Sequence, residues 1–130
     1  IRFPRVIQPN VRVCLTQKAY NKYRDLIRPG GLLLTDKHYV KQEKKVDARQ
    51  VELDMYVETK ERIGKPVVFN VCMLGSLIEL TRLVKKTSIL KVLKDRMPSE
   101  LLSENNEALK LGIELAVKYK QTNRFNFYFY

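Results

Sequence analysis

The stretch KAYNKYRDLIRPGGLLLTD, residues 18–36, decides the fold, because it predicts a helix that stops at Pro-Gly-Gly and continues directly as an apolar strand. Pro29 disfavours helical geometry at the residue before it, and Gly30 and Gly31 allow the tight reversal that follows. Residues 32–36, LLLTD, carry apolar side chains on both faces. Such a run is typical of a parallel strand that is covered on both sides.

A second strand is predicted immediately before this helix, in VRVCLT, residues 11–16, although Arg12 stands where a fully buried strand would be apolar. Thr16 is placed to cap the helix. The apolar residues of the helix fall at spacings of three and four: Ala19, Tyr20, Tyr23, Leu26 and Ile27. Strand, helix, turn and strand together predict a βαβ unit of an α/β sheet.

Two further elements follow a charged loop. RQVEL, residues 49–53, is a candidate third strand, and residues 54–64 predict a short helix that Asp54 opens and Gly64 ends. From residue 70 the chain is apolar almost all round, which predicts a central buried helix with Asn70 as its N-cap. Gly75 and Ser76 in its middle cost helix stability, so we expect a neighbouring helix or strand to approach closely there.

The C-terminal part is expected to be helix-rich. An amphipathic helix is predicted to begin at Thr87 or Ser88 and to stop before Pro98. The last helix, within residues 99–119, carries one stripe of Leu101, Asn105, Ala108, Gly112, Leu115, Ala116 and Tyr119. Asn105 on this stripe is either a buried amide that bonds a backbone group or, less favoured, a substrate contact.

Composition indicates one ordinary globular domain over residues 1–130, with 45% hydrophobic and 30% charged residues, and an aromatic tail at residues 121–130. That tail is an interaction strand, a docking segment for a partner, or a consequence of where the chain was cut. No apolar run is long enough for a membrane span and no leader opens the chain, so we expect a cytoplasmic protein. We expect Cys14 and Cys72 to be reduced, buried thiols and His38 to be solvated.

The net charge of +11, from 25 Lys and Arg against 14 Asp and Glu, suits a nucleic-acid or membrane surface. The cations stand in short scattered clusters mixed with carboxylates, and no DNA- or RNA-binding motif accompanies them. A solvated surface is therefore favoured over a basic binding module. The residues show no phosphate loop, no metal-ligand spacing and no nucleophile with a base, so we expect no catalytic or metal-binding residue.

The order of three motifs resembles the gamma subunit, or gamma domain, of the 2-oxoacid:ferredoxin oxidoreductases, most closely those acting on 2-oxoglutarate. The match runs from about residue 4 to residue 117. The first motif comprises Thr16, Gln17, Ala19, Tyr20, Lys22, Tyr23, Pro29, Gly30, Gly31 and Asp36. The second comprises Asn70, Leu74 and Gly75, and the third comprises Asn105, Ala108 and Gly112.

The resemblance implies a Rossmann-like three-layer α/β domain with a mostly parallel sheet, acting as a non-catalytic, structural subunit. The implied assembly oxidatively decarboxylates a 2-oxoacid to an acyl-CoA and passes electrons to ferredoxin. Thiamine diphosphate, iron–sulfur clusters and CoA would belong to that assembly, and none is expected on this chain. The implied partners are alpha, beta and ferredoxin-like subunits, with a homodimer left open and neither membrane nor nucleic acid expected.

The residues expected to matter are structural or interface residues: Tyr20, Tyr23, Pro29, Gly30, Gly31, Asn70, Gly75, Asn105 and Gly112. The sequence departs from the family at Asn10 and Arg12, and the family's N-terminal glycine-rich part does not precede the segment at Pro4. The chain therefore looks like the C-terminal portion of the domain, which could leave the strand at residues 32–34 without one neighbour. A basic binding module for nucleic acid or an acidic protein, and a truncated relative without a partner, stay as alternatives.

Overall fold

A computed structural model describes the chain as two compact units, residues 1–53 and 54–130, and each unit is considered by itself. The described residues are 11–24, 31–43, 49–82, 85–96 and 98–123. That residues 1–130 form a single domain stays a prediction. The aromatic part of the tail, from residue 124 onward, lies outside the described residues.

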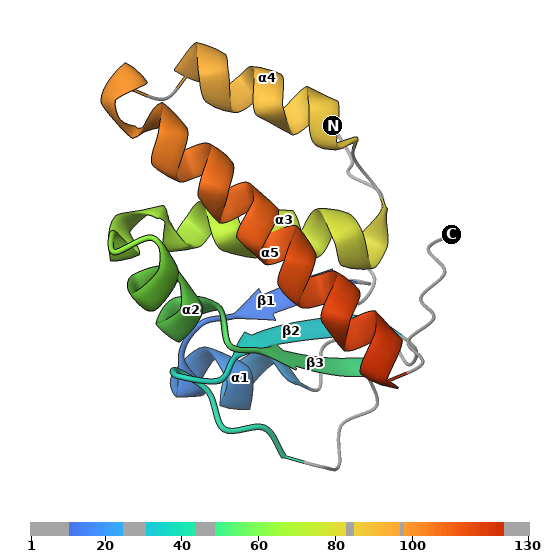
Figure 1. Ribbon diagram of the computed structural model, residues 1–130. Helices are drawn as coiled ribbons and strands as arrows, with labels where there is room; N and C mark the ends of the chain where they lie inside the picture. The colour runs from blue at the N-terminus through green and yellow to red at the C-terminus, as the bar shows by residue number, and fades with distance from the viewer. Residues whose placement is uncertain (1–10, 25–30, 44–48, 83–84, 97, 124–130) are drawn as a thin grey trace, which may run out of the picture. The chain divides into compact units, whose positions relative to one another are not determined.

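The first unit is built on a parallel sheet in the order β1-β2-β3 (Figure 1), with strands β1 (Val11–Cys14), β2 (Leu32–Asp36) and β3 (Arg49–Leu53). All five residues of β2 are buried, as a central parallel strand requires. The expectation that this strand could lack a neighbour is wrong, because β1 and β3 flank it on its two sides. The third strand has the bounds that the sequence predicts.

Helix α1 (Gln17–Tyr23) connects β1 to β2 and completes the predicted βαβ unit. The hydroxyl of Thr16 accepts a hydrogen bond from the amide of Ala19 at 3.0 Å, so Thr16 is the N-cap that the sequence predicts. Gly31 joins the sheet through its carbonyl oxygen, which accepts from the Arg49 amide at 2.7 Å. Residues 25–30, including Pro29 and Gly30, lie outside the described residues.

The second unit is helical. Its elements are α2 (Met55–Arg62), η2 (Pro66–Val68), α3 (Phe69–Thr81), α4 (Lys86–Arg96), η3 (Ser99–Leu101) and α5 (Leu102–Asn123). The α/β class, the parallel sheet and the helix-rich C-terminal part are thus confirmed. No described helix combines the length and the apolar character that crossing a membrane requires.

Two helix starts differ from the sequence-based expectation. Asn70 is not the N-cap of α3; the helix begins at Phe69, Val68 precedes it, and the Asn70 side chain is exposed. The reason is that the 3-10 turn at Pro66–Val68 runs straight into α3, so no separate capping residue is needed. Helix α4 begins at Lys86, before both of the predicted starts, Thr87 and Ser88.

Helices α3 and α5 cross at two glycines, and this crossing forms the core of the second unit (Figure 1). A Cβ atom on Gly75 would lie 2.3 Å from the carbonyl oxygen of Leu109, and one on Gly112 would lie 1.9 Å from that of Cys72. Neither position can hold a side chain without moving a backbone. The close approach that the sequence predicts at Gly75 is confirmed, and α5 is the neighbour.

Ser76 fastens the same crossing with hydrogen bonds. Its buried hydroxyl lies 3.0 Å from the carbonyl oxygen of Gly112 and 3.2 Å from that of Cys72, so it can donate across the interface or back along its own helix. Because the site is fully buried, leaving that hydroxyl unpaired would cost more than the bond itself contributes. The close packing at the two glycines therefore also gives the buried Ser76 hydroxyl a hydrogen-bond acceptor on the other helix.

An ionic cluster fixes the C-terminal end of α3. The ammonium of Lys120 on α5 donates to the Glu79 carboxylate at 2.8 Å and to the Glu79 carbonyl at 3.0 Å, and Arg82 donates to the same carboxylate at 2.8 Å. Burial raises the pKa of Glu79, but the hydrogen bonds and positive charges of Lys120 and Arg82 outweigh it and hold the pKa below its ordinary value. Lys120 thus also caps a carbonyl near the end of the helix.

Replacement of Gly112 by alanine is expected to lower the free energy of unfolding by about 3 kcal/mol, since one of two backbones must shift to admit the methyl group. Gly64→Ala is the matched control. Gly64 has a φ of 80°, and a methyl group added there would meet no atom within 4 Å, so only backbone strain of about 1 kcal/mol is expected. Urea denaturation of both variants gives the two values, and equal losses would contradict the packing explanation.

Glu79→Gln is expected to cost about 1 kcal/mol at pH 7, discounted for the exposure of Arg82. Because the folded-state pKa lies below the ordinary value of 4.5, the stabilisation is present above about that pH and is lost as the pH falls through the folded pKa. In urea denaturation at a series of pH values, the difference between wild type and variant should therefore shrink below pH 4.5. Glu114→Gln, which breaks an exposed ion pair, should stay within about 0.5 kcal/mol of wild type throughout.

Candidate functional site

The carboxyl ends of the strands of the first unit are the natural place for a site, because ligands of parallel α/β sheets bind there. A surface hollow lies at this edge, formed by residues that follow β1 and β2 or belong to the end of β3. Its lining residues are Gln17, Lys37, His38, Tyr39, Val40, Lys41 and Glu52. The loop after β2 supplies most of them, so whatever holds this loop determines the shape of the hollow.

Gln17 holds the loop at one point. Its side-chain amide nitrogen donates to the Lys41 carbonyl at 3.1 Å, and its amide oxygen accepts from the Lys41 amide at 2.7 Å. A glutamine side chain that uses donor and acceptor together imitates a backbone partner. The helix α1 thus takes the place of a neighbouring strand for residue 41.

Tyr20 holds the loop at a second point, two residues further on. Its hydroxyl accepts from the Glu43 amide at 2.7 Å and donates to the Gln50 side-chain oxygen at 2.5 Å. The Gln50 amide nitrogen donates in turn to the Glu43 carbonyl at 2.5 Å, which closes a ring of three hydrogen bonds. Tyr20 is fully buried, and its ring packs with Cys14, Leu33 and Val40.

Tyr23, one turn further along α1, has a different role. The guanidinium of Arg12 lies 4.4 Å from the centroid of the Tyr23 ring, in cation–π geometry. This contact explains how β1 tolerates an arginine on the face that α1 covers. The ring of Tyr23, rather than its hydroxyl, is therefore the part of the side chain that the described residues use.

The sequence points to Tyr20 and Tyr23, whereas the contributions of Gln17 and Gln50 emerge only from the structure. The available signal for Gln50 was its place in β3, on the face opposite to the apolar Val51 and Leu53. The polar groups of Gln17, Tyr20 and Gln50 form hydrogen bonds with backbone groups of the loop or with one another. They therefore shape the hollow by positioning its loop.

The turn that starts the loop is made by Asp36, a fully buried residue at the end of β2. Its carboxylate accepts from the His38 amide at 3.0 Å, and its carbonyl accepts from the Val40 amide at 3.0 Å. The His38 ring packs edge-on against Tyr39, with 4.8 Å between centroids. Two lysines, Lys37 and Lys41, add positive charge to the rim of the hollow, and Glu52 adds one carboxylate.

The cysteines are poorly suited to chemistry. Burial raises the pKa of the Cys14 thiol, and the nearby charge of Arg12 opposes this only in part, so the thiol is protonated at neutral pH. Cys72 is also buried, and both cysteines are free, as the sequence predicts. Within the described ranges, no three His, Cys, Asp or Glu side chains come together as a metal site.

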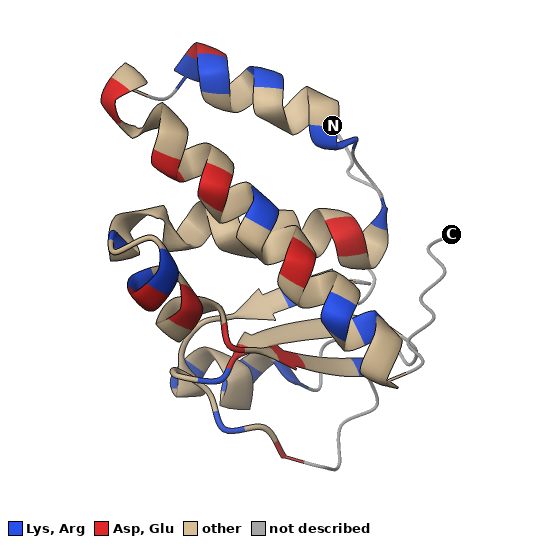
Figure 2. Ribbon diagram, in the orientation of Figure 1, with Lys and Arg blue, Asp and Glu red and all other residues tan. Residues whose placement is uncertain are grey.

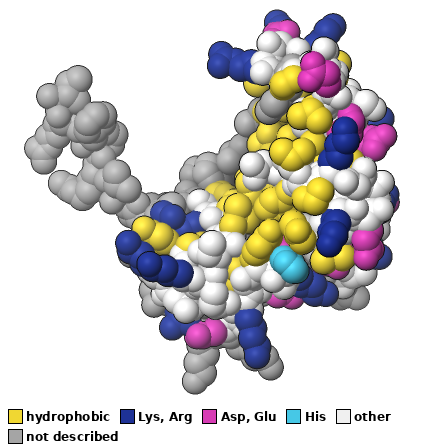
Figure 3. Space-filling view, turned by 90° about the vertical axis from the view of Figure 1, so that its left-hand side faces the viewer, with side chains coloured by type: hydrophobic (Ala, Val, Ile, Leu, Met, Phe, Trp, Pro, Cys, Tyr) yellow, Lys and Arg dark blue, Asp and Glu magenta, His cyan; other side chains and the backbone are white. Residues whose placement is uncertain are grey.

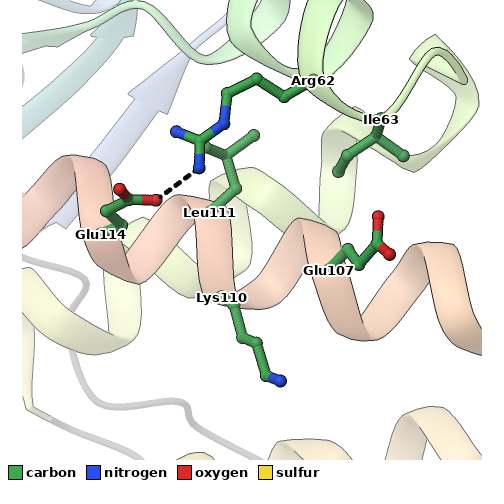
Figure 4. A pocket seen from close by; sticks show the side chains of 6 residues that line it. All are labelled: Arg62, Ile63, Glu107, Lys110, Leu111 and Glu114. Atoms are coloured by element: carbon green, nitrogen blue, oxygen red, sulfur yellow. Dashed lines mark hydrogen bonds and ion pairs between the residues drawn. The ribbon is translucent and has the colours of Figure 1, made fainter.

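A second hollow lies in the helical unit, between the end of α2 and the middle of α5. Arg62, Ile63, Glu107, Lys110, Leu111 and Glu114 line it. Figure 4 shows Arg62 reaching across to Glu114, with 2.9 Å between its Nη2 and the carboxylate, while Lys110 points away. The hydrogen bond to Glu114 raises the pKa of Arg62, which stays charged. The charges around this hollow are balanced, so it has no evident ligand preference.

The remaining named residues of the second unit are Gly75, Gly112, Asn105 and Asn70. Gly75 and Gly112 meet at the crossing of α3 and α5, and Asn105 is buried on α5 one turn before Ala108. The Asn105 amide nitrogen has no hydrogen-bond partner among the described residues, so the expected bond from that atom to a backbone group is not seen. Asn70 is exposed in the first turn of α3, between the buried Phe69 and Val71.

Tyr20→Phe is expected to lower the free energy of unfolding by about 1–2 kcal/mol, because it leaves the Glu43 amide and the Gln50 side chain without their partner. Tyr23→Phe removes the same atom but keeps the ring that Arg12 covers, so a change below about 0.5 kcal/mol is expected. Thermal unfolding gives both values, and amide exchange at Glu43 should accelerate only in the Tyr20 variant. Equal losses of unfolding free energy and equal exchange rates at Glu43 in the two variants would show that the Tyr20 hydroxyl does not anchor the loop.

The sequence of the chain is similar to those of two named oxidoreductase subunits. The chain is 39% identical over 118 residues to the 2-oxoglutarate synthase subunit KorC of Methanocaldococcus jannaschii, covering 89% of this chain and 63% of that protein. It is 30% identical over 124 residues to the KorC subunit of Methanothermobacter thermautotrophicus, covering 91% and 66%. The chain thus spans slightly less than two thirds of the length of these relatives.

A solved structure agrees with the fold. The gamma subunit of a keto/oxoacid ferredoxin oxidoreductase from Geobacter sulfurreducens superimposes with a TM-score of 0.80 at 28% identity, covering 85% of this chain and 66% of that one. The resemblance to gamma subunits that the three motifs indicate is therefore confirmed. Residues 1–115 match the pyruvate ferredoxin/flavodoxin oxidoreductase family, and the chain belongs to this family.

Proposed function

We propose that this chain serves as the gamma subunit, or part of it, of a 2-oxoacid:ferredoxin oxidoreductase that acts on 2-oxoglutarate. The observation that carries the proposal is the family match over residues 1–115, together with 39% identity to a 2-oxoglutarate synthase subunit. Such an assembly would oxidatively decarboxylate the 2-oxoacid to an acyl-CoA and deliver electrons to ferredoxin.

The role proposed for this chain within the assembly is structural. The polar residues of its first motif are engaged in holding backbone: Thr16 caps α1, Gln17 binds Lys41 and Tyr20 binds Glu43. The two thiols are buried, and burial keeps that of Cys14 protonated. Thiamine diphosphate, iron–sulfur clusters and CoA would accordingly be held mainly by the partner subunits, which supply the chemistry while this chain supplies position and interface.

The alternative of a nucleic-acid-binding module receives no support from the relatives described above, which are oxidoreductase subunits. Cytoplasmic localisation is part of the proposal, since an assembly of this kind works with ferredoxin as its electron carrier. A homodimer within the assembly stays a proposal without a specific contact behind it.

The test is anaerobic purification of the tagged chain after co-expression with the alpha, beta and ferredoxin-like subunits. We expect a complex of fixed stoichiometry that reduces methyl viologen with 2-oxoglutarate and CoA, and much more slowly with pyruvate. A parallel preparation without this chain serves as the control and should yield less assembled, less active enzyme. A complex that forms equally well without the chain would contradict the structural role, and a preference for pyruvate would contradict the substrate.

A further inference from the structure

Helix α4, together with Lys85 just before it, is the most one-sidedly charged part of the second unit. Residues 85–96 contain five cations and a single carboxylate, Asp95. The other described residues of that unit, 54–82 and 98–123, contain seven cations and eight carboxylates. Figure 2 shows this contrast between α4 and the mixed colours of α5. Lys85 and Lys86 are one of the short cationic clusters that the sequence shows, and here the cations are not balanced by carboxylates.

The cations of this segment have no ion-pair partners among the described residues, whereas four of the seven cations in residues 54–82 and 98–123 do: Arg62, Lys65, Arg82 and Lys120. Arg62, Lys65 and Lys120 each lie within 3.4 Å of a carboxylate oxygen. None of the ion pairs of the described residues includes a cation of residues 85–96, namely Lys85, Lys86, Lys91, Lys94 and Arg96. All five side chains are exposed.

Most of these cations are placed where they work against the stability of α4. Lys85 and Lys86 stand at its N-terminal end, where the helix dipole disfavours positive charge, and the first turn contains no acidic residue. Lys91 and Lys94 are three residues apart, so they lie on the same side of the helix and repel each other. Lys94 and Arg96 lie in the last turn, where the dipole favours positive charge, so the unfavourable placement concerns Lys85, Lys86 and the repulsion between Lys91 and Lys94.

One apolar side chain lies among these charges. Val92 is 50% exposed, whereas the next residue, Leu93, is the buried residue of α4. In Figure 3 the dark blue side chains of this helix project at the top of the view. An apolar centre with a charged rim is the usual anatomy of a protein–protein interface.

We propose that the exposed face of α4, formed by Lys91, Val92, Lys94 and Arg96, docks the carboxylate-rich face of a partner protein; Lys85 and Lys86 instead line a hollow beside Glu79 and Arg82. Charge complementarity argues for the occupant, since an anionic surface would offer carboxylate partners to Lys91, Lys94 and Arg96. A protein is favoured over nucleic acid because α4 has no aromatic side chain to stack on a base and no Asn or Gln to read a base edge. The proposal does not depend on the proposed function.

The experiment measures binding of the 130-residue chain to purified ferredoxin, used as a small acidic probe protein, by titration calorimetry at about 50 mM and about 300 mM NaCl. The test variant is Lys91→Glu/Lys94→Glu. The matched control is Lys110→Glu/Lys118→Glu, which makes the same change of net charge at two exposed positions on α5. Circular dichroism establishes that each variant keeps the wild-type helix content.

We expect the wild-type affinity to fall with salt, the α4 variant to bind about tenfold more weakly at low salt, and the control to change by less than about threefold. Ferredoxin whose carboxylates have been amidated should not bind. If both variants lost the same affinity for ferredoxin, the effect would be one of net charge and the proposal would be overturned. The absence of binding at both salt concentrations would overturn it as well. Tighter binding of a DNA duplex, lost in the α4 variant alone, would overturn it in favour of nucleic acid.

Discussion

The contact between α3 and α5 at Gly75 and Gly112 is the constraint on which the helical unit depends. Each glycine lies where a Cβ atom would enter the backbone of the other helix, at 2.3 Å and 1.9 Å. This close approach brings the Ser76 hydroxyl within reach of the Gly112 carbonyl, and it brings Lys120 to the end of α3. A larger residue at either glycine would therefore cost packing, a buried hydrogen bond and an ionic cap together.

The sheet unit uses the polar residues of its first motif in a comparable way. Gln17 and Tyr20 bind alternate backbone units of the loop after β2, so a helix performs the pairing that a strand performs elsewhere in a sheet. The hollow at the carboxyl edge exists because this loop is held. Because Gln17 and Tyr20 form hydrogen bonds with the backbone of this loop, they hold the surface of the hollow in place. This agrees with the structural role proposed for the chain.

Charge is distributed by two different rules in the helical unit. Around α2, α3 and α5, four of the seven described cations lie in ion pairs, and the Glu79 cluster joins two helices. Along α4, the cations of the described residues stand outside any ion pair and beside an exposed valine. The Glu79 cluster contributes to stability in the isolated chain, whereas the outward-facing cations of α4 would gain a carboxylate partner only in a complex.

The sequence by itself determined the βαβ unit, the third strand, the order of the helices and the close approach at Gly75, because periodicity, Pro-Gly-Gly and a glycine in an apolar helix are local signals. It also determined the family, through the order of three motifs. Tertiary structure alone decided that α5 is the partner at Gly75, that β2 has a neighbour on each side, and that Gln17 and Gln50 hold a loop far along the chain. It likewise showed that Asn70 lies outside the cap and that Asn105 Nδ2 has no partner among the described residues. These features depend on which backbone atoms meet across the fold, and no local pattern of residues encodes such a meeting.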